Sequence, residues 1–118
     1  FYRDLLGMQL HVSWDKGAYL SAGELWFCLN LGQPKPAADY SHIAFSVQTE
    51  ALAALRARLP DLAVQQWQQN SSEGDSLYLL DPDGHQLELH CGSLQTRLRA
   101  LEQSPYSGLI WHSKPKQD

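Results

Sequence analysis

A glutamate in the middle of an alternating run is the first residue whose position suggests chemistry. Residues 86–91 follow the tight turn DPDG and alternate between polar and apolar side chains, which predicts a half-buried strand. Leu87 and Leu89 would then face the core, and Glu88 would lie at mid-strand on the opposite face. A carboxylate in that position is either an ordinary solvated residue or part of a site.

A histidine on a second alternating run could meet this glutamate. Residues 40–47 predict another strand, with His42 on its polar face. An imidazole nitrogen and a carboxylate oxygen on one concave face suit a divalent metal such as manganese, iron, zinc or nickel. No HxH or HExxH spacing accompanies them, so solvated or hydrogen-bonded roles stay open. His90 has the parity of Glu88, and we expect simple exposure there ahead of a supporting role.

A polar loop and one arginine are the remaining candidates. The loop from Asn70 to Ser76 holds three serines, an asparagine, two carboxylates and a glycine. Oxygen atoms at this density can bind a monovalent cation, and donors can bind a phosphoryl group. A solvated turn has the same composition, so that alternative stays open. Arg97 could bind an anion with two donors, or be an exposed helix residue.

The elements that must position these residues fall into two similar halves. Strands are expected over residues 8–14, 18–22, 25–31, 40–47, 63–68, 76–80 and 86–91, and helices over 49–59, with Thr49 as N-cap, and around Leu94, Leu98 and Leu101. The chain begins without methionine, and its first residues are typical of a helix that ends at Gly7. The simplest arrangement is two β-α-β-β-β units, the first without its leading strand. The apolar faces would pack under the helices, and the polar faces would form a cup.

Composition narrows the functional classes. The 118 residues are 43% hydrophobic and 19% charged, with a net charge of −4, which predicts one globular domain and gives no electrostatic case for nucleic acid or an anionic membrane. No apolar run approaches a membrane span, and no signal peptide is evident. We expect Cys28 and Cys91 to be reduced packing residues of a cytoplasmic protein.

Six segments carry a resemblance to a known family. The segments YRDLLGM, GAYLSAGELWFCL, ADYSHIAF, NSSEGDSLYLLDPDGHQLELH, GSLQTRL and SPYSG resemble the manganese-dependent fosfomycin resistance glutathione transferases of the vicinal oxygen chelate superfamily. The resemblance implies an α+β fold of paired βαβββ modules forming a cupped mixed sheet. It divides a single domain, residues 1–118, into a first module at 1–32, a second at 39–92, and a C-terminal helix and tail at 93–118.

The resemblance also implies a reaction, its cofactors and an assembly. The thiol of glutathione would add to the epoxide of fosfomycin in a homodimer whose metal sites are shared, with Mn²⁺ or another divalent metal and K⁺ as cofactors. The residues that match the family are His42 and Glu88 for the metal; Asn70, Ser72, Gly74 and Ser76 for potassium; Ser72, Tyr78 and Arg97 for the phosphonate; Trp26 and Tyr106 for the pocket; and Tyr19 near the thiol.

Three departures from the family pattern leave alternatives open. A further histidine ligand lies upstream of Phe1 in the family and is absent from this sequence. Gln68 replaces the usual lysine beside the phosphonate, and Ile43 replaces a tyrosine on the core-facing side. The alternatives are an epoxide hydrolase, with Asp15 as a conceivable base, a transferase that uses bacillithiol or cysteine, a glyoxalase, and a metal-free drug-binding protein.

Overall fold

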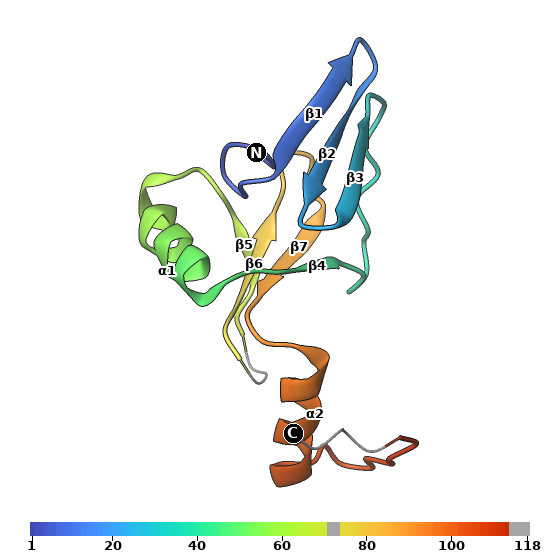
Figure 1. The fold of residues 1–118 in the computed structure, drawn as a ribbon, viewed down its shortest axis with the longest axis vertical. Helices are drawn as coiled ribbons and strands as arrows, with labels where there is room; N and C mark the ends of the chain where they lie inside the picture. The colour runs from blue at the N-terminus through green and yellow to red at the C-terminus, as the bar shows by residue number, and fades with distance from the viewer. Residues whose placement is uncertain (71–73, 114–118) are drawn as a thin grey trace.

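The computed structural model describes residues 1–70 and 74–113, whose strands form two sheets (Figure 1). The first sheet is an antiparallel meander in the order β1-β2-β3. Its strands are β1 (Gln9–Trp14), β2 (Gly17–Ala22) and β3 (Leu25–Asn30). They carry Tyr19 and Trp26, two of the candidate pocket residues.

The second sheet is mixed and has the order β4-β7-β6-β5. Strand β4 pairs in parallel with β7, and the other pairs are antiparallel. Its strands are β4 (Ile43–Ser46), β5 (Gln66–Gln68), β6 (Ser76–Leu80) and β7 (Gln86–His90), and the helices are α1 (Thr49–Arg58), the 3-10 turn η1 (Leu59–Asp61) and α2 (Leu94–Gln103). The parallel strands β4 and β7 need a crossover connection, which α1, η1, β5 and β6 provide.

The apolar core lies between α1 and one face of the second sheet. Leu52 and Leu55 of α1 are buried, and Leu87 and Leu89 of β7 are 0% and 3% exposed. Burial of each leucine stabilises the fold by roughly 1.5–3 kcal/mol. Because side chains alternate along β7, this packing places Glu88 on the face away from α1.

The N-terminal turn connects the two sheets. Tyr2 is buried, and its hydroxyl donates to Asp81 Oδ2 at 2.6 Å, in the turn between β6 and β7. Its ring also contacts Phe27 of β3, which in turn contacts Phe45 of β4. Burial, and then the hydrogen bond to Asp81, raise the pKa of the Tyr2 phenol well above its usual value.

Helix α2 begins with a complete capping box and extends away from the sheets (Figure 1). The Ser93 side chain accepts from the Thr96 backbone N–H, and the Thr96 side chain accepts from the Ser93 N–H. None of the residues of α2 is buried, and Leu94 is 70% exposed. The expected helix therefore forms, but among the described residues Leu98 and Leu101 are only partly buried and do not join the core cluster.

The α+β class expected from the sequence is confirmed, with corrections at individual residues. Thr49 is the first residue of α1 and not its cap, because Gln48 takes that position without a side-chain bond. Cys91 is buried, as expected of a packing residue. Cys28 is exposed on β3, so the prediction that it is a packing residue is wrong. Ile43, expected on the core-facing side of β4, is 51% exposed and lines a cavity together with Tyr2 and Phe27.

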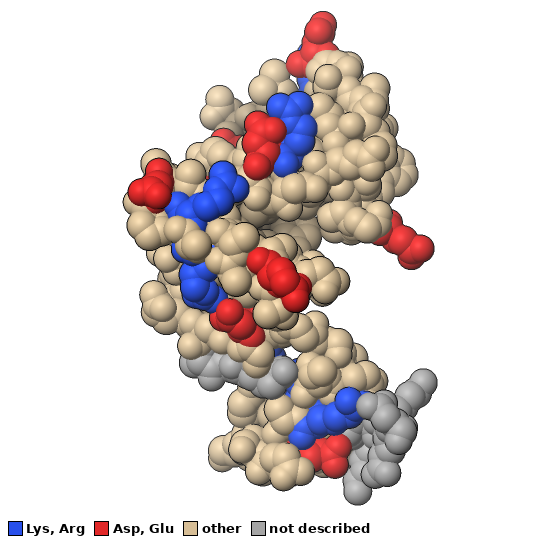
Figure 2. Space-filling model, turned by 60° about the vertical axis from the view of Figure 1, so that its left-hand side comes forward, with Lys and Arg blue, Asp and Glu red and all other residues tan. Residues whose placement is uncertain are grey.

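Charged side chains of both signs alternate over the surface drawn in Figure 2. The described part of the chain contains no helix that is both long and apolar enough to cross a membrane.

Candidate metal and anion site

His42 and Glu88 meet on the open face of the second sheet. The parallel register aligns Ala44 of β4 with Glu88 of β7, and His42 immediately precedes β4. Its Nε2 lies 3.0 Å from Glu88 Oε1, and the two side chains are only 18% and 11% exposed. The tertiary structure thus brings together the two residues that strand parity alone placed on similar faces.

The hydrogen bond behind His42 favours a cation between this pair. His42 Nδ1 donates to the Tyr40 carbonyl oxygen at 2.9 Å, so in the neutral imidazole Nε2 carries a lone pair. That lone pair faces a carboxylate oxygen, and two acceptors are stable there only with a proton or a metal ion between them. Two ligands at right angles on an octahedral ion with bonds of about 2.1 Å stand about 3 Å apart. The nitrogen and oxygen donors therefore fit a divalent cation such as Mn²⁺.

Aromatic rings surround His42. The ring centroids of Tyr40, Trp67 and Tyr78 lie 5.1, 5.2 and 6.1 Å from the His42 ring. Tyr78 was expected on this face, whereas sequence reasoning missed Trp67 and Tyr40 as site residues. A bulge between Gln66 and Gln68 explains the omission of Trp67, because an extra residue breaks the two-residue period on which the prediction rests.

The second carboxylate oxygen of Glu88 has partners of its own. Ser76 Oγ donates to Oε2 at 2.9 Å and lies 2.6 Å from His90 Nδ1. Ser76 and Glu88 are buried, and the His90 side chain is 15% exposed. The expectation that His90 is simply exposed is therefore wrong, because the antiparallel register places it opposite Ser76.

The polar loop before β6 lies beside this cluster. Asn70 Nδ2 donates to the Gly74 carbonyl oxygen at 2.8 Å, and Gly74 has a φ of +76°. Arg56 of α1 forms an ion pair with Asp75. Ser72, a candidate for both potassium and the phosphonate, lies outside the described residues. Ser76 thus lies next to Glu88, and Asn70 and Gly74 lie in the loop that leads into β6.

Two further candidates border the His42–Glu88 pair. Arg97 of α2 lines a cavity of about 300 Å³ together with Glu88 and His90. Gln68 of β5 is half-buried, and its Nε2 donates to the Tyr40 hydroxyl at 2.9 Å. Both side chains can therefore reach an anion that binds beside the carboxylate.

The first sheet carries the remaining candidates on a separate surface. Tyr19 packs edge-on against Trp26 and Trp14, with centroid separations of 5.1 and 4.8 Å. These rings are 38%, 67% and 45% exposed, and Tyr19 and Trp26 line their own cavity of about 280 Å³. Tyr106, which follows α2, is 58% exposed. The cavity that Tyr19 and Trp26 line therefore does not include Glu88. Asp15 lies exposed in the turn between β1 and β2, on the same sheet.

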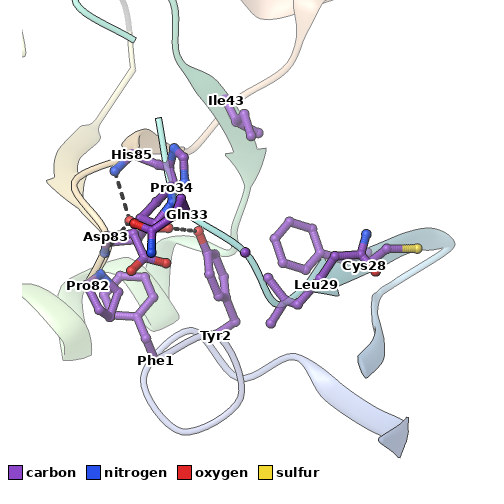
Figure 3. A pocket seen from close by; sticks show the side chains of 14 residues that line it. Phe1, Tyr2, Cys28, Leu29, Gln33, Pro34, Ile43, Pro82, Asp83 and His85 are labelled. Carbon is purple, nitrogen blue, oxygen red and sulfur yellow. Dashed lines mark hydrogen bonds between the residues drawn. The ribbon is translucent and has the colours of Figure 1, made fainter. Parts of the chain in front are cut away.

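A cavity of about 550 Å³ lies elsewhere, between the N-terminal turn, β3 and the β6–β7 turn (Figure 3). None of the candidate site residues within the described ranges lines it. It contains Asp81, Asp83 and His85, whose potential ligand atoms lie within 4.8 Å of one another. Asp81 Oδ1 accepts the backbone N–H groups of Asp83 and His85, and Oδ2 accepts from Tyr2. These bonds explain the cluster as the cap of a turn.

Comparison with known proteins finds similarity over most of the chain. The model of the Glyoxalase/Bleomycin resistance protein/Dioxygenase superfamily matches residues 1–89. The sequence is 48% identical to glutathione transferase FosA of Serratia marcescens, over 96% of this chain and 84% of that protein. It is 37% identical to the metallothiol transferase FosB of Shouchella clausii, over 93% and 81% of the two chains.

Solved structures show the same similarity. The fosfomycin resistance protein FosX of Listeria monocytogenes, crystallised with Mn(II) and a sulfate ion, aligns with a TM-score of 0.73 and 30% identity, over 85% of this chain and 82% of that one. FosX of Mesorhizobium loti aligns with a TM-score of 0.67 and 26% identity, over 82% and 81%.

Proposed function

Because the chain belongs to the Glyoxalase/Bleomycin resistance protein/Dioxygenase superfamily, and within it to the fosfomycin resistance proteins, we propose that it is a metal-dependent transferase that adds the thiol of glutathione to the epoxide of fosfomycin. The observation that carries this proposal is the 3.0 Å approach of His42 Nε2 to Glu88 Oε1. Glutathione is the thiol we favour, because the relative with 48% identity is named a glutathione transferase. The FosB relative, named a metallothiol transferase, has the lower identity of 37%. Because the reaction would destroy the epoxide of fosfomycin, it would confer resistance to that antibiotic.

His42 and Glu88 would hold the divalent cation, which we take to be Mn²⁺. When bound, it supplies Lewis-acid stabilisation of the oxygen that becomes an alkoxide as the epoxide opens. Nδ1 of His42 is held by the Tyr40 carbonyl, and Oε2 of Glu88 by Ser76, so each ligand atom is oriented before the cation arrives. The family resemblance adds a histidine from upstream of Phe1, which is not among these 118 residues.

The phosphonate of fosfomycin would lie between the loop and α2. Arg97 lines the cavity beside Glu88, and its guanidinium can donate two parallel hydrogen bonds to an anion. Tyr78 and Gln68 lie on the same side of the sheet and can donate further bonds. Ser72 belongs to this set by resemblance. Fixing the phosphonate holds the epoxide carbon in one orientation toward the thiol.

We assign potassium to the loop that begins at Asn70. The side-chain and carbonyl oxygens of Asn70, Gly74 and Ser76, with Ser72 by resemblance, form the proposed ligand set. The Gly74 carbonyl already accepts from the Asn70 amide, so the two residues are close enough to share one cation. A monovalent cation here would offset negative charge next to Glu88.

The thiol side of the site would come from a second copy of the chain. Tyr19 and Trp26 are exposed on the first sheet, away from the metal pair of their own chain, and α2 also leaves its leucines uncovered. A homodimer that placed one chain's first sheet over the partner's second sheet would bury both surfaces. It would also bring Tyr19, Trp26 and Tyr106 to the metal pair. We place this dimer in the cytoplasm, where glutathione is abundant and both cysteines stay reduced.

Epoxide hydration is the second candidate function. FosX of Listeria monocytogenes was also solved with Mn(II) and a dihydroxypropylphosphonic acid, which is fosfomycin with water added to its epoxide. That structure has 30% identity to this chain, below the 48% identity to the glutathione transferase. A water-using enzyme needs a base, and the exposed Asp15 turn offers a carboxylate only if the partner chain brings it to the site.

The test is conversion of fosfomycin by the full-length protein in the presence of Mn²⁺ and K⁺. We expect a glutathione adduct by mass spectrometry, its loss when Mn²⁺ is removed, and its loss in Glu88→Ala while light scattering still reports a dimer. The control is Glu102→Ala, which removes an α2 carboxylate outside the site. A diol in place of the adduct would establish the hydrolase. Metal-independent adduct, or full activity in Glu88→Ala, would refute the assignment of the metal site.

A further inference from the structure

His90 is a histidine in the site for which the proposed reaction has no use. It contributes no ligand to the cation and has no assigned contact with substrate, yet its side chain is 85% removed from solvent. Its Nδ1 lies 2.6 Å from Ser76 Oγ and 3.4 Å from Glu88 Oε2. A buried imidazole with such short contacts has a defined orientation, which implies a defined effect on its neighbours.

The direction of the hydrogen bonds follows from the donor inventory. An ionised carboxylate only accepts, so the single hydroxyl proton of Ser76 goes to Glu88 Oε2. Ser76 Oγ can then only accept from His90, and the neutral His90 ring must carry its proton on Nδ1. The chain of donation therefore runs from His90 to Ser76 to Glu88.

This chain assigns different tasks to the two oxygens of Glu88. Oε2 is held by the Ser76 hydroxyl, and Oε1 faces His42 Nε2. Without the donor from His90, Ser76 Oγ would lose one of its two side-chain partners, and the direction of its hydroxyl would be less well fixed. The carboxylate would then lose the bond that keeps Oε1 directed at the cation position.

The polar loop holds the His90 ring in place. A methyl group at Gly74 would stand 3.1 Å from His90 Cε1 and 2.7 Å from the Cys91 carbonyl oxygen, so Gly74 packs closely against the ring. The Cys91 N–H donates to the Asp75 carbonyl at 2.9 Å and fastens the loop to the end of β7. Gly74 and Asp75 therefore limit the space into which the ring could move.

We propose that His90 is a positioning residue, which orients Glu88 for the cation through the Ser76 hydroxyl and couples that orientation to Gly74 and Asp75. The inference rests on the proposed function, because it assumes that Glu88 is a metal ligand. It adds that cation affinity depends on a donor at the position of His90 Nδ1, two hydrogen bonds away from the ion. Residues that orient a metal ligand in this way typically change affinity by about 10–100-fold when they are lost.

Two substitutions in the full-length protein separate the donor from the ring. In His90→Asn the side-chain amide nitrogen can occupy the position of Nδ1 and still donate to Ser76. In His90→Leu a side chain of similar bulk lacks any donor. His85→Leu is the matched control, because it removes a half-buried histidine from the same hairpin at the opposite end of β7.

Mn²⁺ affinity measured by titration calorimetry is the main readout, with melting temperature and the separate kcat and KM for fosfomycin beside it. We expect His90→Leu to weaken Mn²⁺ binding about 10–100-fold, and His90→Asn and His85→Leu to stay within about threefold of the wild type. Equal Mn²⁺ affinity in His90→Leu and wild type would overturn the inference, as would equal losses in His90→Leu and His90→Asn. Nitrogen NMR of the metal-free protein gives a second check, since a His90 proton on Nε2 would also contradict the chain of donation.

Failure of the inference differs from failure of the proposed function. A wild-type protein that binds no Mn²⁺ would overturn the metal site and the inference together. A wild-type protein that binds Mn²⁺ and transfers glutathione, with His90→Leu unchanged in both, would overturn the role of His90 alone.

Discussion

Removal of one hydroxyl group at Tyr2 tests how the N-terminal turn is fastened to the hairpin that carries Glu88. Tyr2→Phe keeps the ring and its contacts with Phe1 and Phe27, whose centroids lie 5.1 and 4.7 Å away. It deletes only the 2.6 Å hydrogen bond to Asp81 Oδ2. The change in the free energy of unfolding therefore reports that bond.

The expected loss follows from the burial of both partners. Tyr2 is 9% exposed and Asp81 7%, so water does not readily replace the missing donor. A hydrogen bond to a charged group contributes about 1.5–3 kcal/mol, and we expect Tyr2→Phe to lower the free energy of unfolding by that amount. Asp81 Oδ1 keeps its two backbone donors, so the turn and the Mn²⁺ affinity should stay as in the wild type.

Because the pKa of the Tyr2 phenol is raised, the stabilisation from the Tyr2–Asp81 hydrogen bond should depend on pH. Burial and the Asp81 carboxylate raise that pKa above the unfolded value of about 10. The stabilisation is therefore complete below pH 10 or so, and it is lost above that value because only the unfolded state then releases its proton. The difference in stability between wild type and Tyr2→Phe should be constant from neutral pH to about pH 9 and should then shrink.

Urea unfolding at fixed protein concentration, followed by tryptophan fluorescence, measures both effects. Ser104→Ala, at the exposed end of α2, is the control for a lost surface hydroxyl. A stability change below about 0.5 kcal/mol in Tyr2→Phe would refute the reasoning. A wild-type stability that followed Tyr2→Phe in parallel above pH 10 would refute the pKa assignment.

Three further predictions concern the core, the anion site and the loop. Leu87→Ala, at a fully buried position, should lower the free energy of unfolding by about 2–5 kcal/mol in urea titrations, and an effect below 1 kcal/mol would contradict the described core. Gln68→Lys should lower the KM for fosfomycin and leave kcat within about twofold, because it adds a positive charge beside the phosphonate. An unchanged KM in steady-state assays would show that charge at this position does not affect fosfomycin binding. Gly74→Ala should abolish activation by K⁺, because the added methyl group would lie 2.7 Å from the Cys91 carbonyl oxygen and the backbone at Gly74 has a φ of +76°. If K⁺ titrations of this variant match the wild type, the loop is not the potassium site.

Much of the second module could be predicted because its signals are local. The alternation of residues 86–90 identified β7 and its two faces, and the leucine spacing of residues 52–59 identified the buried stripe of α1. Glu88 was found in the same way, since a polar residue on an otherwise buried strand is conspicuous in a sequence. His42 was found from the alternation of residues 40–47, which puts it on the polar side. Side-chain period and helix spacing are properties of neighbouring residues, so a single chain segment contains them.

Other features depend on elements that are distant in the sequence. The environment of His90 follows from its pairing with Ser76 across two strands, and that of Trp67 from a bulge that interrupts the period of β5. The exposure of Cys28 and Ile43 depends on which surfaces the helices cover, and this chain leaves those two uncovered. None of these outcomes is encoded by the residue type or by its immediate neighbours.

The sequence by itself determined the class of fold, the polar faces of β4, β6 and β7, and the donor types available for a metal and an anion. The tertiary structure decided that His42 and Glu88 stand 3.0 Å apart, that Ser76 and His90 hold the other carboxylate oxygen, and that Tyr19 and Trp26 lie on a different surface. The physical reason is that alternation fixes only the direction in which a side chain points. The register between strands and the packing of the two sheets fix which side chains meet, and both arise from contacts between distant parts of the chain.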